Sequence, residues 1–344
     1  MGWHAQCHVS HMGTARSAKG DIRIGISGWR YEPWRGVFYP KGLAQRRELE
    51  FASRMVPTIE INGSFYSLQR PAYYAAWRDE TPDDFVFAVK APKYITHLRR
   101  LKEIETPLAN FFANGIFELR HKLGPILWQF PPMLPFKPDR FEAFFAMLPH
   151  DTAAAARIAQ GHDERVADRM SLEVDRKRPM CHAVEIRHPS FVDPAFIAML
   201  RHYKIALVVA DTAGKWPLLE DLTADFVYVR LHGDKELYAS GYSDAALDHW
   251  AARVDTWSRG AQVADAHLAA QKTAPKRATR DVYCYFDNDV KVHAPYDAAT
   301  LSRKLGMESR IGERGAPLPE WLTAKPRQRA EGFTATKKKA QVAG

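Results

Sequence analysis

Short apolar runs alternate with amphipathic stretches along the chain, and this pattern predicts eight β/α units. Runs rich in Val, Ile, Phe and Tyr are typical of buried strands, whereas apolar positions three and four residues apart are typical of helices. The predicted strands occupy residues 22–29, 58–65, 85–91, 125–130, 182–187, 205–211, 226–232 and 282–287. Helices are expected over residues 42–55, 71–80, 105–123, 138–148 and 298–305, and after the N-capping residues Asp193 and Ser243.

Eight strands that alternate with helices are the number that closes a parallel sheet into a barrel. We therefore predict an α/β protein with a single (β/α)8 TIM-barrel domain over residues 21–306, in which 151–178 and 261–280 are inserted stretches with little strand character. A doubly wound open sheet is the competing fold. That fold usually has a Gly-rich phosphate loop after its first strand, and the segment Gly25-Ile26-Ser27-Gly28-Trp29 does not match it.

Composition limits the class of protein. Of the 344 residues, 46% are hydrophobic and 26% are charged, which excludes a wholly disordered chain. No run of about 18 apolar residues occurs, so no membrane span is predicted. Three cysteines in a chain of this length fit a reducing compartment, and we expect a cytoplasmic protein.

The formal charge of +9 lies mainly at the two ends of the chain. Residues 1–20 carry a net +2 and residues 325–344 a net +5, which leaves +2 for the body. Residues 1–20 are predicted to be a disordered extension, and the C-terminal segment 307–344 is predicted to end in a disordered basic tail. A basic tail gives non-specific affinity for phosphates, so nucleic acid is a candidate partner of the tail, the alternative being a solvated tail without a partner. The sequence leaves the oligomeric state open.

Strand parity predicts a polar ring inside the barrel. Alternate residues of a barrel strand face the interior and the helices, so apolar positions that face the helices leave polar ones facing inward. These polar residues fall near the C-terminal ends of the strands, where barrel active sites lie. The charged members are Glu60, Lys90, Glu185, Arg187, Asp211, Arg230, His232 and Asp287. Burying so many charges is costly unless they pair or bind a ligand, so we interpret the ring as a site and keep a salt-bridge lattice without substrate as the alternative.

Seven segments of the body occur in an order that resembles a known family. They are IGISGW (24–29), TIEINGSFY (58–66), FAVKAP (87–92), QFPP (129–132), VEIRHP (184–189), YVRLHG (228–233) and YFDND (285–289). Together they are similar to the YecE-like family, domain of unknown function 72. The resemblance implies a TIM barrel and leaves the chemistry open.

The first functional hypothesis is an enzyme that uses acid–base chemistry on an anionic small molecule bearing phosphate or carboxylate. Glu185 or Glu60 would be the general base and His232 the acid, with Asp287 orienting it. Arginine suits oxyanions because its fork can bind two oxygens. The expected substrate contacts are Ser27, Trp29, Asn62, Tyr66, Lys90, Gln129, Arg187, Asp211, Arg230, Tyr238 and Asn288. This hypothesis predicts a hydrolase, lyase or isomerase without a cofactor.

Two further hypotheses stay open. Glu185, Asp211, His232 and Asp287 could ligate a divalent metal such as Zn²⁺ or Mn²⁺ in a phosphodiesterase, nuclease or sugar isomerase. A single histidine is few for a zinc cluster, and the neighbouring cations would repel the ion. The third hypothesis is a barrel that binds a ligand without catalysis, its carboxylates being structural.

Overall fold

The chain folds as a (β/α)8 barrel, as the strand count predicts. The computed structural model describes residues 19–317 except 273, 313 and 316, so the expectations for 1–18 and for the basic tail at 325–344 lie outside the described residues. Eight parallel strands close in sequence order, each pairing with the next and β8 with β1. Their bounds are β1 (Ile22–Ser27), β2 (Thr58–Ile61), β3 (Val86–Lys90), β4 (Leu123–Gln129), β5 (His182–Glu185), β6 (Ala206–Asp211), β7 (Phe226–Leu231) and β8 (Asp281–Phe286).

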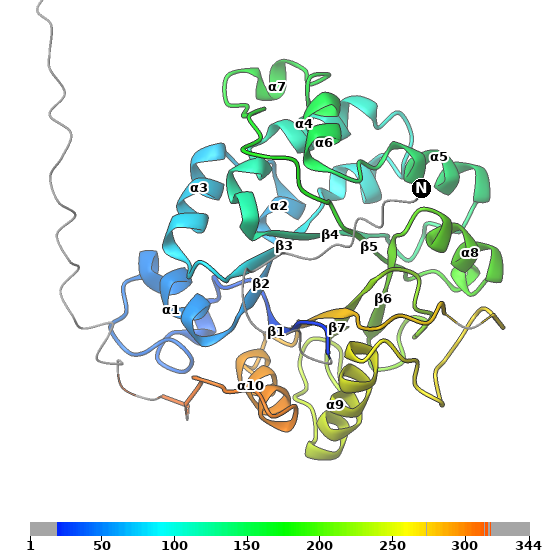
Figure 1. Ribbon diagram of the computed structural model, residues 1–344. Coiled ribbons are helices and arrows are strands. Elements are labelled where there is room, and N and C mark those ends of the chain that lie inside the picture. Colours follow the sequence, from blue (N-terminus) through cyan, green and yellow to red (C-terminus); the bar gives the residue numbers. More distant parts are fainter. Residues whose placement is uncertain (1–18, 273, 313, 316, 318–344) are drawn as a thin grey trace, which may run out of the picture.

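Helices form an outer layer around the strands (Figure 1). The α-helices are α1 (Glu48–Met55), α2 (Gly63–Tyr66), α3 (Pro71–Glu80), α4 (Glu105–Ala113), α5 (Pro138–Met147), α6 (Thr152–Ala159), α7 (Glu164–Ala167), α8 (Pro194–His202), α9 (Asp244–Ser258) and α10 (Ala294–Lys304). The predicted N-caps are confirmed, since Asp193 accepts a hydrogen bond from Ala195 N and Ser243 accepts one from Ala246 N. In the described part of the chain, no helix has the length and apolar character needed to cross a membrane.

Several predicted bounds differ from the structure: the helix expected over 42–55 begins at Glu48, and the helix expected over 298–305 begins at Ala294. Two further elements end early. The single helix expected over 105–123 ends at Ala113, because Gly115 takes a left-handed backbone with φ 100° and its position leaves no room for a Cβ, which would lie 2.4 Å from Pro71 Cα. Short 3-10 turns over Ile116–Lys122 then lead into β4. The strand expected over 58–65 stops at Ile61, and the chain turns at once into α2.

The protein has two apolar cores, one on each side of the barrel strands. The larger core lies between the strands and the helices and includes Ile24, Phe87, Trp128 and Val229. The smaller core fills the barrel itself with Val86, Ala88, Leu127, Ala183, Ala206, Val208, Ala210, Phe226, Tyr228, Tyr283 and Tyr285. On the strands other than β6 these are the alternate positions that parity places inside, so the predicted facing of those strands is confirmed. The pattern of β6 is weaker, and its inward residues Ala206, Val208 and Ala210 give Asp211, a predicted member of the ring, the opposite parity. The lumen is a packed core, and polar groups are left to its C-terminal end.

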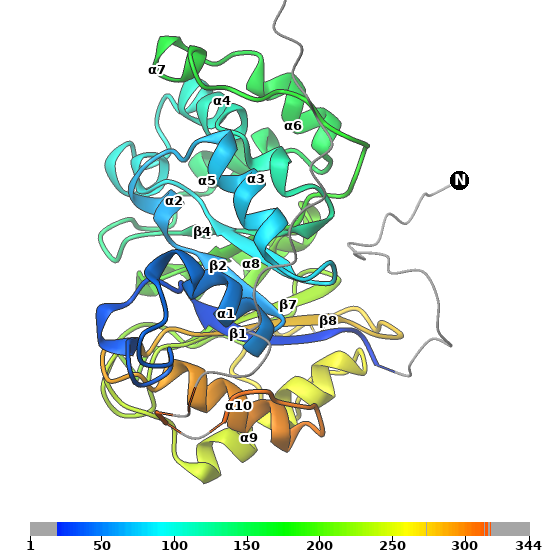
Figure 2. The same ribbon diagram turned by 90° about the vertical axis from the view of Figure 1, so that its left-hand side faces the viewer.

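The polar end of the barrel is the end at which every strand leaves for its following helix. Figure 2 shows β1 and β8 running side by side, with the chain after β1 and the helix α2 at the same end of the molecule. Loops at this end position the side chains around the polar ring.

Candidate active site

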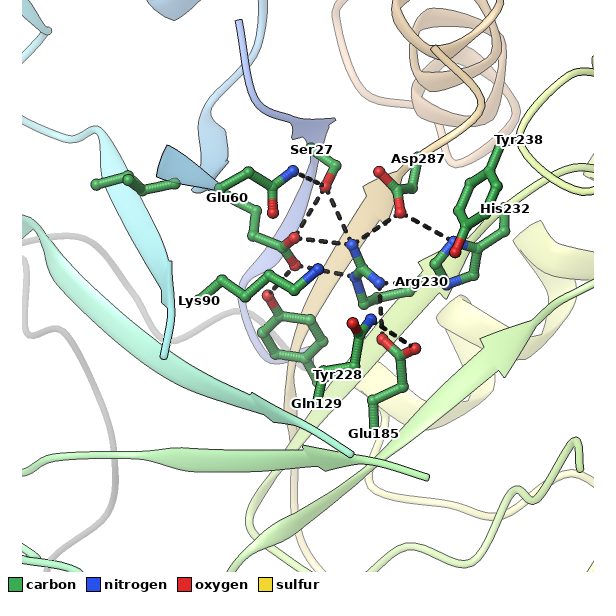
Figure 3. Close-up of polar contacts among 12 residues, drawn as sticks. Ser27, Glu60, Lys90, Gln129, Glu185, Tyr228, Arg230, His232, Tyr238 and Asp287 are labelled. Atoms are coloured by element: carbon green, nitrogen blue, oxygen red, sulfur yellow. Dashed lines mark hydrogen bonds and ion pairs between the residues drawn. The ribbon is translucent and has the colours of Figure 1, made fainter. Parts of the chain in front are cut away.

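A fully buried arginine at the end of β7 organises the polar ring. Arg230 Nε and Nη2 donate to the two oxygens of Glu60, at 3.0 and 2.9 Å, and Nη1 donates to Glu185 Oε2 at 2.7 Å (Figure 3). Nη2 also reaches Asp287 Oδ2 at 2.9 Å. Further contacts join Nη2 to Ser27 Oγ at 3.1 Å and Nη1 to His232 Nε2 at 3.3 Å. Every N–H of the guanidinium therefore has an acceptor within the protein.

The two glutamates around Arg230 are equally engaged. Glu60 accepts from Ser27 Oγ at 2.8 Å and from Tyr228 Oη at 2.7 Å, while Glu185 accepts from Gln129 Nε2 at 2.8 Å. Burial alone would raise the pKa of Glu185, but Arg230 and then Arg187 outweigh it and hold that pKa well below its usual range. Glu185 is thus an ionised partner of fixed cations.

Asp287, just after β8, belongs both to this cluster and to the open end of the barrel. Its Oδ2 lies 2.9 Å from His232 Nδ1. Because His232 Nε2 receives an N–H of Arg230, the ring proton of a neutral imidazole sits on Nδ1 and faces this carboxylate. Burial would raise the pKa of Asp287, yet Arg230 and His232 prevail and keep that pKa far below its usual range. The cavity side of the cluster therefore ends in an ionised carboxylate held by a buried histidine.

A cavity of about 700 Å³ opens above the cluster. Its volume suits a small metabolite. It is lined by Gly28, Trp29, Arg30, Tyr31, Ile61, Asn62, Gly63, Phe65, Tyr66, Gln69, Trp77, Lys90, His97, Gln129, Arg187, Tyr238, Asp287 and Asp289.

Two cations in this lining keep unused hydrogen-bonding capacity. Arg187 stacks its guanidinium 3.8 Å from the ring centre of Trp216, and its Nε and Nη2 meet Glu185 at 2.9 Å. Nη2 also donates to Tyr238 Oη at 3.2 Å, whereas Nη1 has no partner among the described residues. Lys90 Nζ lies 4.4 Å from the ring centre of Phe65, and within the described ranges no hydrogen bond or ion pair reaches it. Burial, together with the nearby Arg230, lowers the pKa of Lys90 to about 8.

The cavity also holds a second carboxyl group in the opposite state. Burial, and next the charge of Asp287, raise the pKa of Asp289 well above its usual value. Asp289 Oδ1 is buried with no hydrogen-bond partner in the part of the chain that the structure describes. One carboxyl group of the cavity is thus ionised and the other favours the protonated form, an arrangement typical of an acid and a base in one site.

A protein-family model with the description "Protein of unknown function DUF72" matches residues 23–321. The chain belongs to the DUF72 family. It is 30% identical over 123 residues to the UPF0759 protein YunF of Bacillus subtilis, an alignment that covers 34% of this chain and 43% of YunF. It is 29% identical over 128 residues to the UPF0759 protein YecE of Escherichia coli, which covers 33% of this chain and 44% of YecE. These alignments span less than half the length of either relative.

Solved DUF72 structures share the fold. A DUF72 protein of Thermotoga maritima superposes with a TM-score of 0.62 at 23% identity, covering 83% of this chain and 99% of that one. One from Enterococcus faecalis superposes with a TM-score of 0.59 at 16% identity, covering 87% of this chain and 99% of that one. At these identities the likeness supports the barrel alone.

The structure divides the sequence-predicted residues of this DUF72 chain into two groups. Those that line the cavity are Trp29, Asn62, Tyr66, Lys90, Gln129, Arg187, Tyr238 and Asp287. Ser27, Glu60, Glu185, Arg230 and His232 lie behind them in the cluster. Asp211 and Asn288 lie in neither group: Asp211 accepts from Tyr242 Oη at 3.0 Å, and Asn288 donates to Ser240 O at 3.0 Å and to Asp297 at 2.8 Å. The last two positions hold loops in place.

Several lining residues were not among the predicted site residues, including Asp289, Tyr31 and His97. Asp289 closes the YFDND segment two residues after Asp287, and that spacing could have indicated it. Tyr31 donates a hydrogen bond to Ser27 O. His97 Nδ1 forms a 2.8 Å hydrogen bond with Thr96 Oγ1. Burial and then the charges of Arg187 and Lys90 lower the pKa of His97 to about 4, so this imidazole is neutral at physiological pH. Both residues come from loops whose position no strand pattern predicts.

Four expected metal ligands do not converge on a common point. Glu185 faces two arginines and Asp211 faces Tyr242, while the side chain of His232 pairs with that of Asp287. Among the residues that the structure describes, no three His, Cys, Asp or Glu side chains form a group that could hold a metal ion.

Proposed function

We propose that this protein is an enzyme that uses acid–base chemistry on a small substrate bearing a phosphate or carboxylate group. The supporting observation is that Lys90 Nζ and Arg187 Nη1, two cationic groups with unused donors, line the same cavity as the ionised Asp287. An oxyanion satisfies such donors, and the planar fork of arginine suits it. The carboxylate beside it supplies a base.

The assignment of roles follows from access to the cavity. Asp287 is the general base, because Glu60 and Glu185 have their oxygens directed at Arg230 and do not line the cavity. His232 is a positioning residue that holds Asp287 through Nδ1. Asp289, whose pKa is raised, is the acid. Arg187, fixed between Glu185 and the Trp216 ring, holds the substrate's acid group.

The test begins with binding of inorganic phosphate and of small phosphorylated or carboxylated metabolites, followed as a shift in the unfolding temperature. Arg187→Met should weaken binding of every responding anion by at least about tenfold, because it removes the free donor edge. Arg78→Met is the matched control: Arg78 is similarly shielded, pairs with Asp79 and Glu118, and lies outside the cavity.

Asp287→Asn then separates binding from chemistry. On a substrate found by the screen, this variant should retain binding and lose turnover by a factor of about 100 or more. Binding without any turnover in the unaltered protein would favour the non-catalytic barrel instead. Anion binding that survives Arg187→Met unchanged would refute the assignment of the cavity.

A further inference from the structure

Lys90 differs from Lys122, another buried lysine of the barrel, because its amine has no polar partner among the residues that the structure describes. Lys122 Nζ donates to Arg78 O at 2.6 Å and to Thr81 O at 2.8 Å, so its charge is used to hold backbone carbonyls. Lys90 is almost as buried, at 8% exposure, but its amine extends from β3 into the barrel end (Figure 3) and lines the cavity. Nearby carboxylates do not capture it, because Glu60, Glu185 and Asp287 are directed at Arg230.

Such an amine is chemically different from a surface lysine. With a pKa of about 8, roughly a tenth of the Lys90 side chains are neutral at pH 7, against fewer than about one in a thousand for an ordinary lysine. A neutral amine in a shielded cavity is a nucleophile toward carbonyl carbon. The Lys90 amine contacts only the face of the Phe65 ring, which accepts no conventional hydrogen bond, so its nitrogen stays accessible to a ligand in the cavity.

We propose that Lys90 forms an imine with the aldehyde or ketone group of an acid-bearing substrate, of which a small 2-oxo acid is the simplest example. This proposal rests on the proposed function, because Arg187 would hold the acid group while Lys90 attacks the carbonyl.

The step balances without an oxidant or reductant. The Lys90 ammonium gives one proton to a base, and the freed lone pair of its nitrogen bonds to the carbonyl carbon while the carbon–oxygen π bond breaks. A second proton passes from the nitrogen to that oxygen, which becomes a hydroxyl. That hydroxyl accepts a proton and leaves as water, and the nitrogen keeps one hydrogen in the protonated imine. Asp287, ionised, and Asp289, protonated, line the same cavity and can take and give these protons.

The experiment traps the imine on the full chain. The protein is incubated with glyoxylate and sodium cyanoborohydride at pH 7, and peptide mass mapping locates the carboxymethyl-amine product. Labelling of Lys90 is expected to be at least tenfold faster than labelling of the exposed Lys137, and Lys122 should stay unlabelled. The rate at Lys90 should rise with pH and level off above about pH 8, following its amine. Mapping of the unaltered protein does not depend on a variant that folds, and Lys90→Met should remove the fast-labelled product.

Other outcomes separate this proposal from the proposed function. Equal labelling of Lys90 and Lys137 would overturn the imine, even if phosphate and glyoxylate still bind in an Arg187-dependent manner. Fast labelling of Lys90 that is equal for glyoxylate and for uncharged propanal, and unchanged by Arg187→Met, would uphold the reactive amine and overturn the anion clamp. Fast labelling by glyoxylate that falls at least tenfold in Arg187→Met, with no such fall for propanal, would support both.

Discussion

At the scale of the residue, Arg230 and Arg187 show that two arginines of one polar ring can do different work. Arg230 is fully buried between three carboxylates, whereas Arg187 pairs with one and keeps a free edge in the cavity. Removing one partner of a buried ionic network leaves the remaining buried charges unpaired. The loss of folding stability is then much larger than the stability that the intact network adds over apolar residues of the same size. Arg230 is therefore a structural requirement of the site, and Arg187 is a contact offered to a ligand.

We expect Arg230→Met to lower the free energy of unfolding by about 3–5 kcal/mol at pH 7. Arg187→Met should lower it by no more than about 2 kcal/mol, since that side chain lies at the cavity edge. Urea unfolding of both variants measures the difference. Equal and small losses in the two would show that the cluster is not held together by Arg230.

The pH dependence of this stability gives a second prediction. The pKa values of Glu185 and Asp287 are lowered in the folded protein. Their contribution is therefore fully present above about pH 4, where the unfolded carboxyls are ionised, and is lost as the pH falls further. In Arg230→Met, burial dominates at Asp287 and raises its pKa, so this variant should gain stability as the pH falls from 7 toward 5. The midpoint of urea unfolding, measured for Arg230→Met and for the unaltered protein from pH 7 to pH 5, tests this direction. Parallel changes of the midpoint with pH in the two proteins would contradict it.

At the scale of the element, strand β1 is held so close to β2 that side-chain size becomes decisive. A Cβ on Gly25 would lie 2.0 Å from Thr58 O, and neither backbone can move without opening the barrel. Gly25→Ala should therefore destabilise the protein by about 3 kcal/mol or more. Gly161 is a suitable control, because a Cβ there meets ordinary contacts at 3.4 and 3.7 Å. Thermal unfolding of the two alanine variants compares them, and similar midpoints would show that β1 can shift.

Elements also show how much of the site the sequence contains. The period of two along the strands was enough to predict that Glu60, Lys90, Glu185 and Arg230 point inward, because parity depends on the strand alone. It could not show which of them face one another and which face the cavity. That division depends on how far each side chain reaches and on loops such as the one carrying Tyr31. Gly115 ends a helix for a similar reason, a close approach to Pro71 that no local pattern contains.

At the scale of the whole molecule, most of the excess positive charge and the cavity belong to different parts of the chain. Residues 325–344 carry a net +5 of the total +9, and they lie outside the described residues. Within the barrel, the Arg230 cluster pairs its buried charges with one another. Any general affinity for nucleic acid should therefore come from the tail, and the cavity should be left to a small anion.

Deletion of residues 325–344 tests this separation. Binding of duplex DNA, followed by fluorescence anisotropy over a range of salt, should weaken strongly, and the slope of log K against log salt should shrink by about 4, because each neutralised phosphate contributes about 0.9. Phosphate binding in the cavity should be unaffected by the deletion. Arg187→Met in the full chain should do the reverse and leave DNA binding intact. If the deletion leaves DNA affinity unchanged while Arg187→Met abolishes it, the cavity itself takes nucleic acid, and the phosphodiesterase or nuclease hypothesis would replace the small-molecule enzyme.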